Sequence, residues 1–128
     1  MIGIDIVKID RIVTLVEKDK NYKVFSRKEI LYAETKCGQS NDNRLIQKKY
    51  ECLAGIFAAK EAFLKAFGLG IGGQLRLGDV EIDHLETGKP FVVLNDDVKK
   101  LLKDIGVSNM DVSISHDGEY AVAVVEII

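Results

Sequence analysis

The sequence has few cysteines and no long apolar run, and these shortages exclude several classes of protein. Its two cysteines, Cys37 and Cys52, lack the C-x-x-C spacing of redox and zinc motifs, so neither a disulfide framework nor a zinc site is expected. No apolar run approaches the length that crosses a bilayer. Asp5, Lys8 and Asp10 near the start fit no signal peptide. We therefore expect a cytoplasmic protein that does not bind membranes.

An excess of one charge is also missing, because 18 basic residues nearly balance 20 acidic ones. Nucleic-acid binding is therefore not indicated, since it calls for a basic surface. The segment from Lys8 to Lys28 is an exception: seven basic and three acidic residues give it a net charge of +4, which leaves −6 for the rest of the chain. This segment is either an ordinary solvated helix face or a docking face for an acidic partner.

The 128 residues suit one domain, 1–128, and neither repeats nor Pro/Ser-rich linkers divide them. Alternating and helix-spaced apolar residues predict the order β-α-α-α-β-β-α-β-β. Strands are predicted at 1–9, 80–82, 91–94, 111–115 and 119–127, and helices at 10–20, 26–37, 44–67 and 96–105. This order predicts an α+β fold in which a mainly antiparallel sheet packs against the long third helix.

Local signals mark where these elements begin and end. Asp10 is expected to cap the first helix, and Ser26 with Glu29 fits a capping box for the second. The glycine-rich run 68–73 ends the longest helix. Asp117-Gly118 lies between two alternating runs, which predicts a hairpin.

Asp5 is an acidic residue within an apolar strand. It shares one strand face with Gly3 and Val7, while three isoleucines occupy the other face. Aspartate is uncommon within strands, and a buried carboxylate needs a partner or a metal ion. The alternative is that the strand ends early and that Asp5 is solvated.

Glu61 continues an apolar stripe on the long helix, because Leu53, Phe57, Glu61 and Lys65 are each four residues apart. A carboxylate in this position is expected to be partly buried. The alternative is an exposed Glu61–Lys65 ion pair, a common surface motif at this spacing.

Two further features are weak when each is taken alone. The run 68–73 has neither the strand-before-helix context of a dinucleotide fingerprint nor the ending of a P-loop, so it either approaches a phosphate or simply caps the helix. His116 ends a strand just before the hairpin turn, where histidines are usually structural or exposed to solvent.

Taken together, the motifs are specific. They are the segments 3–7 (GIDIV), 53–68 (LAGIFAAKEAFLKAFG), 69–75 (LGIGGQL), 88–90 (GKP) and 113–116 (SISH). In order and spacing the chain resembles, nearly end to end, the 4′-phosphopantetheinyl transferase superfamily, and within it the small, single-repeat holo-acyl-carrier-protein synthases. The larger, pseudo-dimeric members carry a second acid where this chain has Val7.

The resemblance implies a reaction and a metal site. The 4′-phosphopantetheine of coenzyme A would pass to a serine of an acyl carrier protein in fatty-acid biosynthesis, releasing adenosine 3′,5′-bisphosphate. Asp5 and Glu61 would bind Mg²⁺, with Mn²⁺ possible, because both ions accept carboxylate oxygens. Lys65, one helix turn after Glu61, would neutralise charge on the phosphates. The general base stays open between a water on the metal ion and Glu61 itself.

The resemblance also implies which residues bind substrate and partners. The implied coenzyme A contacts are Lys48, Lys65, Gly68, Gly70, Gly72, Lys89, Pro90 and His116, with Lys48 near the 3′-phosphate and His116 also counted among the catalytic residues. Arg11 and Lys18 would dock the carrier protein. The small type forms a homotrimer with clefts between subunits. One departure is Ile56, where the family commonly has arginine, and it leaves one phosphate or interface contact in doubt.

Three alternatives stay open at this point. The first is a small α+β module that holds coenzyme A without turnover, although such a module does not need two carboxylates beside a pyrophosphate. The second is the same enzyme acting on a carrier of peptide or siderophore synthesis. A purely structural assembly subunit agrees least with the matched motifs.

Overall fold

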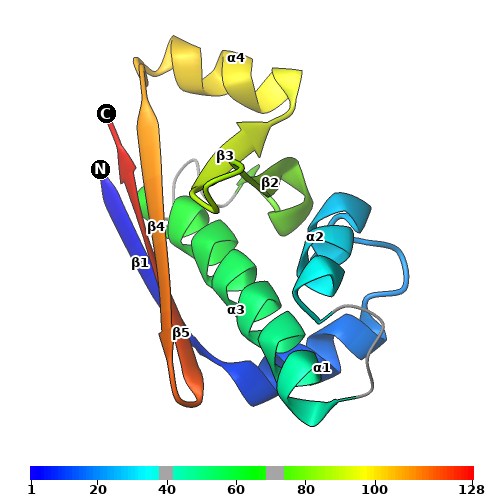
Figure 1. The fold of residues 1–128 in the computed structure, drawn as a ribbon. Helices are drawn as coiled ribbons and strands as arrows, with labels where there is room; N and C mark the ends of the chain where they lie inside the picture. Colours follow the sequence, from blue (N-terminus) through cyan, green and yellow to red (C-terminus); the bar gives the residue numbers. More distant parts are fainter. Residues whose placement is uncertain (38–41, 69–73) are drawn as a thin grey trace.

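A computed structural model describes residues 1–37, 42–68 and 74–128 of the chain. The predicted order of elements is confirmed, with one short 3₁₀ helix added before the second strand (Figure 1). The elements are β1 Ile2–Lys8, α1 Ile9–Lys18, α2 Arg27–Cys37, α3 Asn43–Ala66, η2 Leu77–Asp79, β2 Val80–His84, β3 Pro90–Leu94, α4 Asp96–Asp104, β4 Met110–Asp117 and β5 Tyr120–Ile127.

The strands form two antiparallel sheets. The larger sheet has the order β1-β5-β4, and the smaller one pairs β2 with β3. Asp5 lies opposite Ala123 of the central strand, and Ala123 lies opposite Ile114. The two edge strands, β1 and β4, therefore lie on either side of β5, and each presents its inner face to α3.

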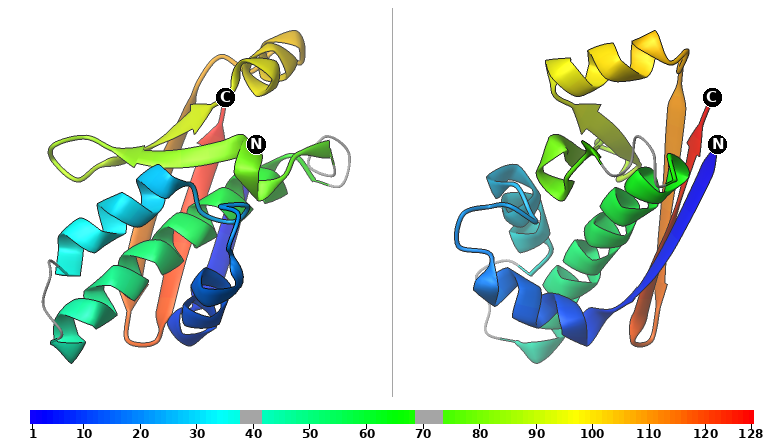
Figure 2. Two further views of the ribbon diagram at one scale, coloured as in Figure 1. Left: turned by 90° about the vertical axis from the view of Figure 1, so that its right-hand side faces the viewer. Right: turned by 180° about the vertical axis from the view of Figure 1, so that it is seen from behind.

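Helix α3 crosses one face of the larger sheet in close contact (Figures 1 and 2). A Cβ atom at Gly3 would overlap the carbonyl oxygen of Ala62, and one at Gly55 would lie 2.6 Å from Cγ2 of Ile114. Glycine at these two positions lets the backbones approach. The helix is buried continuously from Leu53 to Lys60, and it forms the centre of the core.

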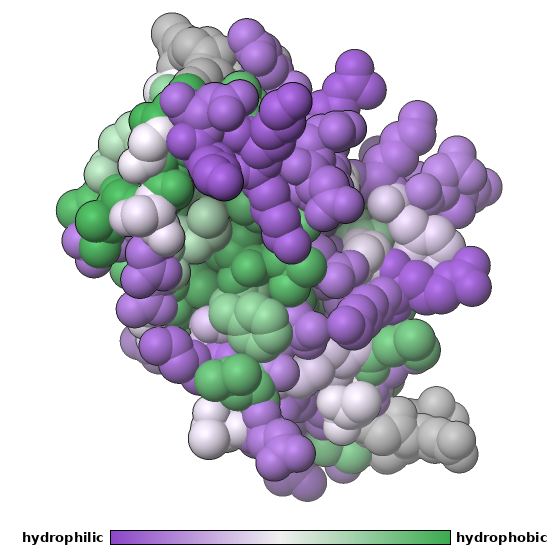
Figure 3. All heavy atoms as spheres, turned by 90° about the horizontal axis from the view of Figure 1, so that it is seen from above, coloured by the Kyte–Doolittle hydropathy of each residue, from purple (hydrophilic) through white to green (hydrophobic). Residues whose placement is uncertain are grey.

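The opposite face of the larger sheet is apolar and exposed. Ile2, Ile4 and Ile6 of β1 are 69%, 61% and 64% exposed, and Val124 of β5 is 38% exposed. No element in the described part of the chain covers this face (Figure 2). Seen from above, apolar side chains gather on the side of the sheet, whereas hydrophilic side chains cover the side of the helices (Figure 3).

The predicted caps are confirmed for α2 and wrong for α1. Ser26 N–H donates to Glu29 Oε1 at 2.8 Å, and Glu29 N–H donates to Ser26 Oγ at 3.1 Å, which is a complete capping box. Helix α1 begins at Ile9 with Lys8 in the capping position, so Asp10 lies in its first turn. An acidic residue there still interacts favourably with the helix dipole.

A buried ion pair joins α2 to α3. Lys60 Nζ lies 2.8 Å from Glu29 Oε1, and both side chains are at most 1% exposed. The same ammonium donates to the Val24 carbonyl at 2.6 Å, and Glu29 Oε2 accepts from Ile82 N–H at 2.8 Å. The pair therefore fixes the loop before α2, strand β2 and helix α3 to one another.

In the described part of the chain, no helix has both the length and the apolar character needed to cross a membrane.

Candidate active site

Asp5 meets Lys65 where β1 packs against α3. Lys65 Nζ donates to Asp5 Oδ1 at 2.7 Å, and the Asp5 side chain is only 12% exposed. Strand β1 continues to Lys8, so the alternative of a strand ending early at a solvated Asp5 is wrong. The alternation had placed Asp5 on the face of Gly3 and Val7, and this is the face that packs against α3.

Glu61 adds a second carboxylate to this cluster. It is half-buried, as the apolar stripe predicted. Burial raises the pKa of its carboxyl, the charge of Asp5 raises it further, and Lys65 and Arg11 act in the opposite direction. In the described part of the chain, Lys65 forms its ion pair with Asp5 and not with Glu61. The alternative of an exposed Glu61–Lys65 ion pair is therefore wrong.

The Asp5–Glu61 pair suits a hard cation. Two carboxylates that repel each other at a partly buried position would be stabilised by a cation between them, and carboxylate oxygens are the ligands that Mg²⁺ and Mn²⁺ accept. The described residues contain no group of three or more His, Cys, Asp and Glu side chains able to hold a metal ion. The donors therefore fit an ion that takes its remaining ligands from water and phosphate, which is usual for Mg²⁺.

His116 and Lys48 lie at a second place, in a hollow of about 450 Å³ between α2, α3 and the end of β4. Its lining residues are Thr35, Lys36, Lys48, Glu51, Cys52 and His116. His116 Nδ1 is 3.7 Å from Glu51 Oε2. Glu51 precedes Glu61 by ten residues on α3, a separation of about 15 Å along the helix. In one chain, His116 and Lys48 are therefore separate from the cluster of Asp5, Glu61 and Lys65.

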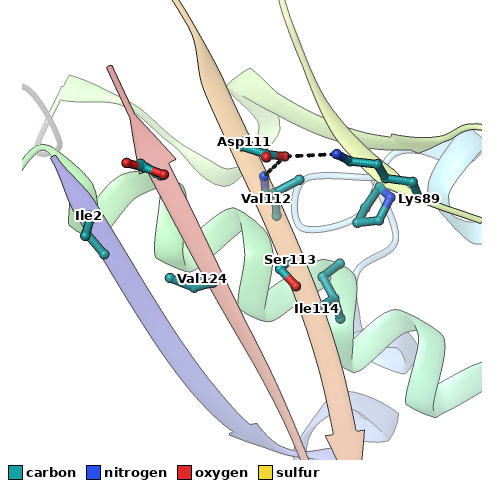
Figure 4. A pocket seen from close by; sticks show the side chains of 9 residues that line it. Ile2, Lys89, Asp111, Val112, Ser113, Ile114 and Val124 are labelled. Carbon is teal, nitrogen blue, oxygen red and sulfur yellow. Dashed lines mark hydrogen bonds and ion pairs between the residues drawn. The ribbon is translucent and has the colours of Figure 1, made fainter.

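Lys89 and Pro90 lie at a third place, a hollow of about 530 Å³ along β4 at the exposed sheet face (Figure 4). Lys89 Nζ is 3.5 Å from Asp111 Oδ1, and Ser113 and Ile114 line the same hollow. Asp111 carried no signal in the sequence, because its position follows only from the packing of β3 against β4.

Gly68 follows α3 and has the left-handed backbone angle φ of +66°, which glycine adopts at no steric cost. Its N–H donates to the Lys65 carbonyl at 3.0 Å, so Gly68 caps the helix. Helix capping was one of the two roles considered for the glycine-rich run. Gly70 and Gly72 fall outside the described residues.

The predicted docking residues lie on α1. The Arg11 guanidinium is 5.6 Å from the centre of the Phe57 ring, and Lys18 lies in the last helix turn. Ile56, the departure from the family pattern, is 1% exposed and belongs to the core. Sequence reasoning missed Lys36, a basic residue in the last turn of α2 that no motif marks.

Comparison with known proteins identifies the class. Residues 1–125 match the family model of the 4′-phosphopantetheinyl transferase superfamily, and the chain belongs to this superfamily. Holo-[acyl-carrier-protein] synthase of Halothermothrix orenii is 37% identical over 127 residues, covering 97% of this chain and 93% of that protein. The synthase of Cytophaga hutchinsonii is 41% identical over 128 residues, with 97% and 93% covered.

The fold agrees with the same class. The crystal structure of Helicobacter pylori holo-[acyl-carrier-protein] synthase, solved in complex with coenzyme A, superposes with a TM-score of 0.77 at 32% identity and full coverage of both chains. The predicted fold class and family resemblance are confirmed.

Proposed function

We propose that this protein transfers the 4′-phosphopantetheine group of coenzyme A to a serine of apo acyl carrier protein in fatty-acid biosynthesis, releasing adenosine 3′,5′-bisphosphate. The observation that carries the proposal is the cluster of Asp5, Glu61 and Lys65, in which two carboxylates and an ammonium group gather at the end of a buried helix. The relatedness to holo-[acyl-carrier-protein] synthases, one of them solved with coenzyme A, supports it.

Asp5 and Glu61 would hold Mg²⁺, or Mn²⁺, at this cluster. The bound ion would draw charge from the pyrophosphate of coenzyme A and orient it for phosphoryl transfer. Because the strand and the helix each supply one carboxylate, their packing sets the distance between the two ligands. The raised pKa of Glu61 means that binding a cation competes with binding a proton at this carboxyl.

Lys65 would act on the phosphates. Its ammonium lies 2.7 Å from Asp5 Oδ1 and one helix turn from Glu61, and its side chain is 55% exposed. It can therefore keep contact with the cluster while it reaches towards a pyrophosphate in solvent. Placed there, it would neutralise charge that develops on the leaving 5′-phosphate as the serine oxygen bonds to phosphorus.

The complete site would form between subunits of a homotrimer. The exposed face of Ile2, Ile4, Ile6 and Val124 is the kind of continuous apolar surface that assembly covers. The two groups of site residues lie about 15 Å apart along α3. In an assembly, Asp5, Glu61 and Lys65 of one subunit would face Lys48 and His116 of the next, which would place both groups on one coenzyme A.

The carrier protein would dock on the basic segment from Lys8 to Lys28. The Arg11 guanidinium lies 5.6 Å from the ring of Phe57, which is one helix turn before Glu61, so a carrier held there would present its serine close to the cluster. Acyl carrier proteins are acidic around the modified serine, and charge complementarity of this kind speeds association and weakens with salt. The protein would act in the cytoplasm, where its substrates are made.

Intact-mass measurement of an apo acyl carrier protein tests the proposal. The carrier is incubated with this protein, coenzyme A and Mg²⁺, and a parallel reaction contains EDTA. We expect a mass gain of one phosphopantetheine that EDTA abolishes. Bound coenzyme A without a mass gain on any carrier would overturn the proposed transfer and favour a binding module.

A further inference from the structure

The hollow between α2, α3 and β4 is basic. Lys36, Lys48 and His116 line it, and Glu51 is the one acidic residue of its lining. Glu51 already lies 3.7 Å from the His116 ring, whereas neither lysine takes part in an ion pair within the described ranges 1–37, 42–68 and 74–128. Two ammonium groups are thus left for an anion in solvent or in a ligand.

Lys36 is held at the wall of this hollow by an aromatic stack. Its Nζ lies 4.8 Å from the centre of the Tyr32 ring, an attractive cation–π contact. The Tyr32 ring is stacked on His84 with 3.8 Å between ring centres and 5° between planes. The stack joins α2 to β2 and restricts the Lys36 side chain. Lys36 therefore loses less conformational entropy when it binds a ligand.

The charge of Lys36 acts on two titratable groups near this stack, Cys52 and His84. Burial raises the pKa of the Cys52 thiol to about 11, and the nearby Lys36 charge acts against that rise. Burial lowers the pKa of His84, the charge of Asp83 acts against this, and Lys36 lowers the pKa as well. Lys36 and Cys52 line the same hollow, and His84 supports the ring against which the ammonium lies.

The side chains that line the hollow favour a phosphate monoester as the ligand. Coenzyme A carries two separate phosphate groups, its pyrophosphate and its 3′-phosphate. The Asp5–Glu61 pair suits a pyrophosphate that shares a cation. The hollow offers amines and an imidazole without a second carboxylate, which suits a dianionic monoester bound directly.

We propose that Lys36, together with Lys48, binds the 3′-phosphate of coenzyme A and makes the enzyme select coenzyme A over 3′-dephospho-coenzyme A. This inference rests on the proposed function and adds to it a residue on α2 that none of the sequence motifs includes. It also gives α2 a part in substrate recognition, because the ligand is held between α2 and α3.

Calorimetric titration of wild type, Lys36→Gln and Lys36→Arg with coenzyme A, 3′-dephospho-coenzyme A and adenosine 3′,5′-bisphosphate tests the inference. Lys100→Gln on the exposed side of α4 is the matched control. For Lys36→Gln we expect the Kd for coenzyme A and for the bisphosphate to rise about tenfold, as for loss of one charge-assisted contact, with the Kd for the dephospho form unchanged. Lys36→Arg should restore most of the affinity.

The outcomes separate this inference from the function on which it rests. If wild type binds coenzyme A and modifies a carrier, but Lys36→Gln weakens the two coenzyme forms equally or neither of them, the assignment of Lys36 is overturned and the transfer stands. If wild type neither binds coenzyme A nor modifies a carrier, both are overturned. In steady state the KM for coenzyme A should rise about tenfold in Lys36→Gln, with kcat and the KM for carrier unchanged.

Discussion

Lys65 donates a 2.7 Å hydrogen bond to Asp5 across 60 positions of sequence, and this contact ties the first strand to the end of the long helix. Its consequence is that the ammonium group stands beside both carboxylates. The contact therefore groups two carboxylates and one ammonium within a single chain.

Asp5→Asn and Glu61→Gln should each reduce carrier modification at least a hundredfold, because each removes one of the two proposed metal ligands. Thermal unfolding followed by circular dichroism should show that both variants fold. A turnover near that of wild type in either variant, at limiting Mg²⁺, would show that the carboxylate is not a ligand.

Glu61 should make stability depend on pH in the absence of metal. Its carboxyl has a raised pKa in the folded protein, so the folded state binds the proton more tightly than the unfolded state does. Stability from this group is therefore lost as pH rises from the ordinary glutamate value, about 4.3, through the raised value. We expect Glu61→Gln to have a higher Tm than wild type at neutral pH without metal, with the difference disappearing at about pH 4.

Added Mg²⁺ should then reverse the order of the two proteins. The ion should raise the Tm of wild type and leave that of Glu61→Gln nearly unchanged, since a ligand that binds only the folded state stabilises it. An equal Tm shift in both proteins would place the metal elsewhere.

Lys60→Met should destabilise the protein strongly, because it leaves Glu29 charged and without its cation in the core. Breaking a buried pair from one side costs about 3–5 kcal/mol. Urea denaturation measures this free energy. Adding Glu29→Gln should recover part of the loss, because it removes the uncompensated charge, and the single amide oxygen can still accept from one of the two N–H groups, Ser26 or Ile82. Lys28→Met, which breaks the exposed Lys28–Asp83 pair, is the control and should change stability little.

Arg11→Glu and Lys18→Glu should each raise the KM for carrier protein about tenfold and the KM for coenzyme A much less, since both reverse a charge on the proposed docking helix. The effect should shrink as salt is added. Lys100→Glu, far along the chain on α4, should leave both constants unchanged. Equal rises in the two constants for Lys18→Glu would remove α1 from the docking surface.

Ile4→Asp should keep the protein monomeric, because it places a charge in the centre of the exposed apolar face. Light scattering of the eluting protein measures its mass directly. We expect a trimer for wild type, and a monomer with under a tenth of the wild-type activity for the variant. A monomeric wild type with full activity would mean that one chain completes its own site.

The strongest sequence signals gave the charged cluster correctly. Strand alternation placed Asp5 on the face of Gly3 and Val7, which the structure packs against α3, and the stripe through Leu53 and Phe57 predicted that Glu61 is partly buried. The partner of Lys65 could not be predicted, because spacing along a helix favours Glu61 while the packing of β1 favours Asp5. Helical spacing describes only neighbours along the chain. Whether Lys65 pairs with Glu61 or with Asp5 depends on the packing of a strand 60 residues earlier in the sequence.

The division of the site could not be read from the sequence either. His116 and Asp5 both point towards α3, but the strand order β1-β5-β4 puts the central strand between them. Periodicity tells which face of a strand is buried and not which strands are neighbours. The same limit explains why one antiparallel sheet was expected and two were found.

Gly3 determines how far a side chain at position 5 must reach. Because the glycine has no Cβ, β1 lies against the backbone of α3 at Ala62, one residue from Glu61. At that spacing the short side chain of aspartate already meets Lys65, and a glutamate, longer by one methylene, would be pushed past the cluster or bent away from it. The choice of acid at position 5 is therefore made by a residue two positions earlier that has no side chain at all.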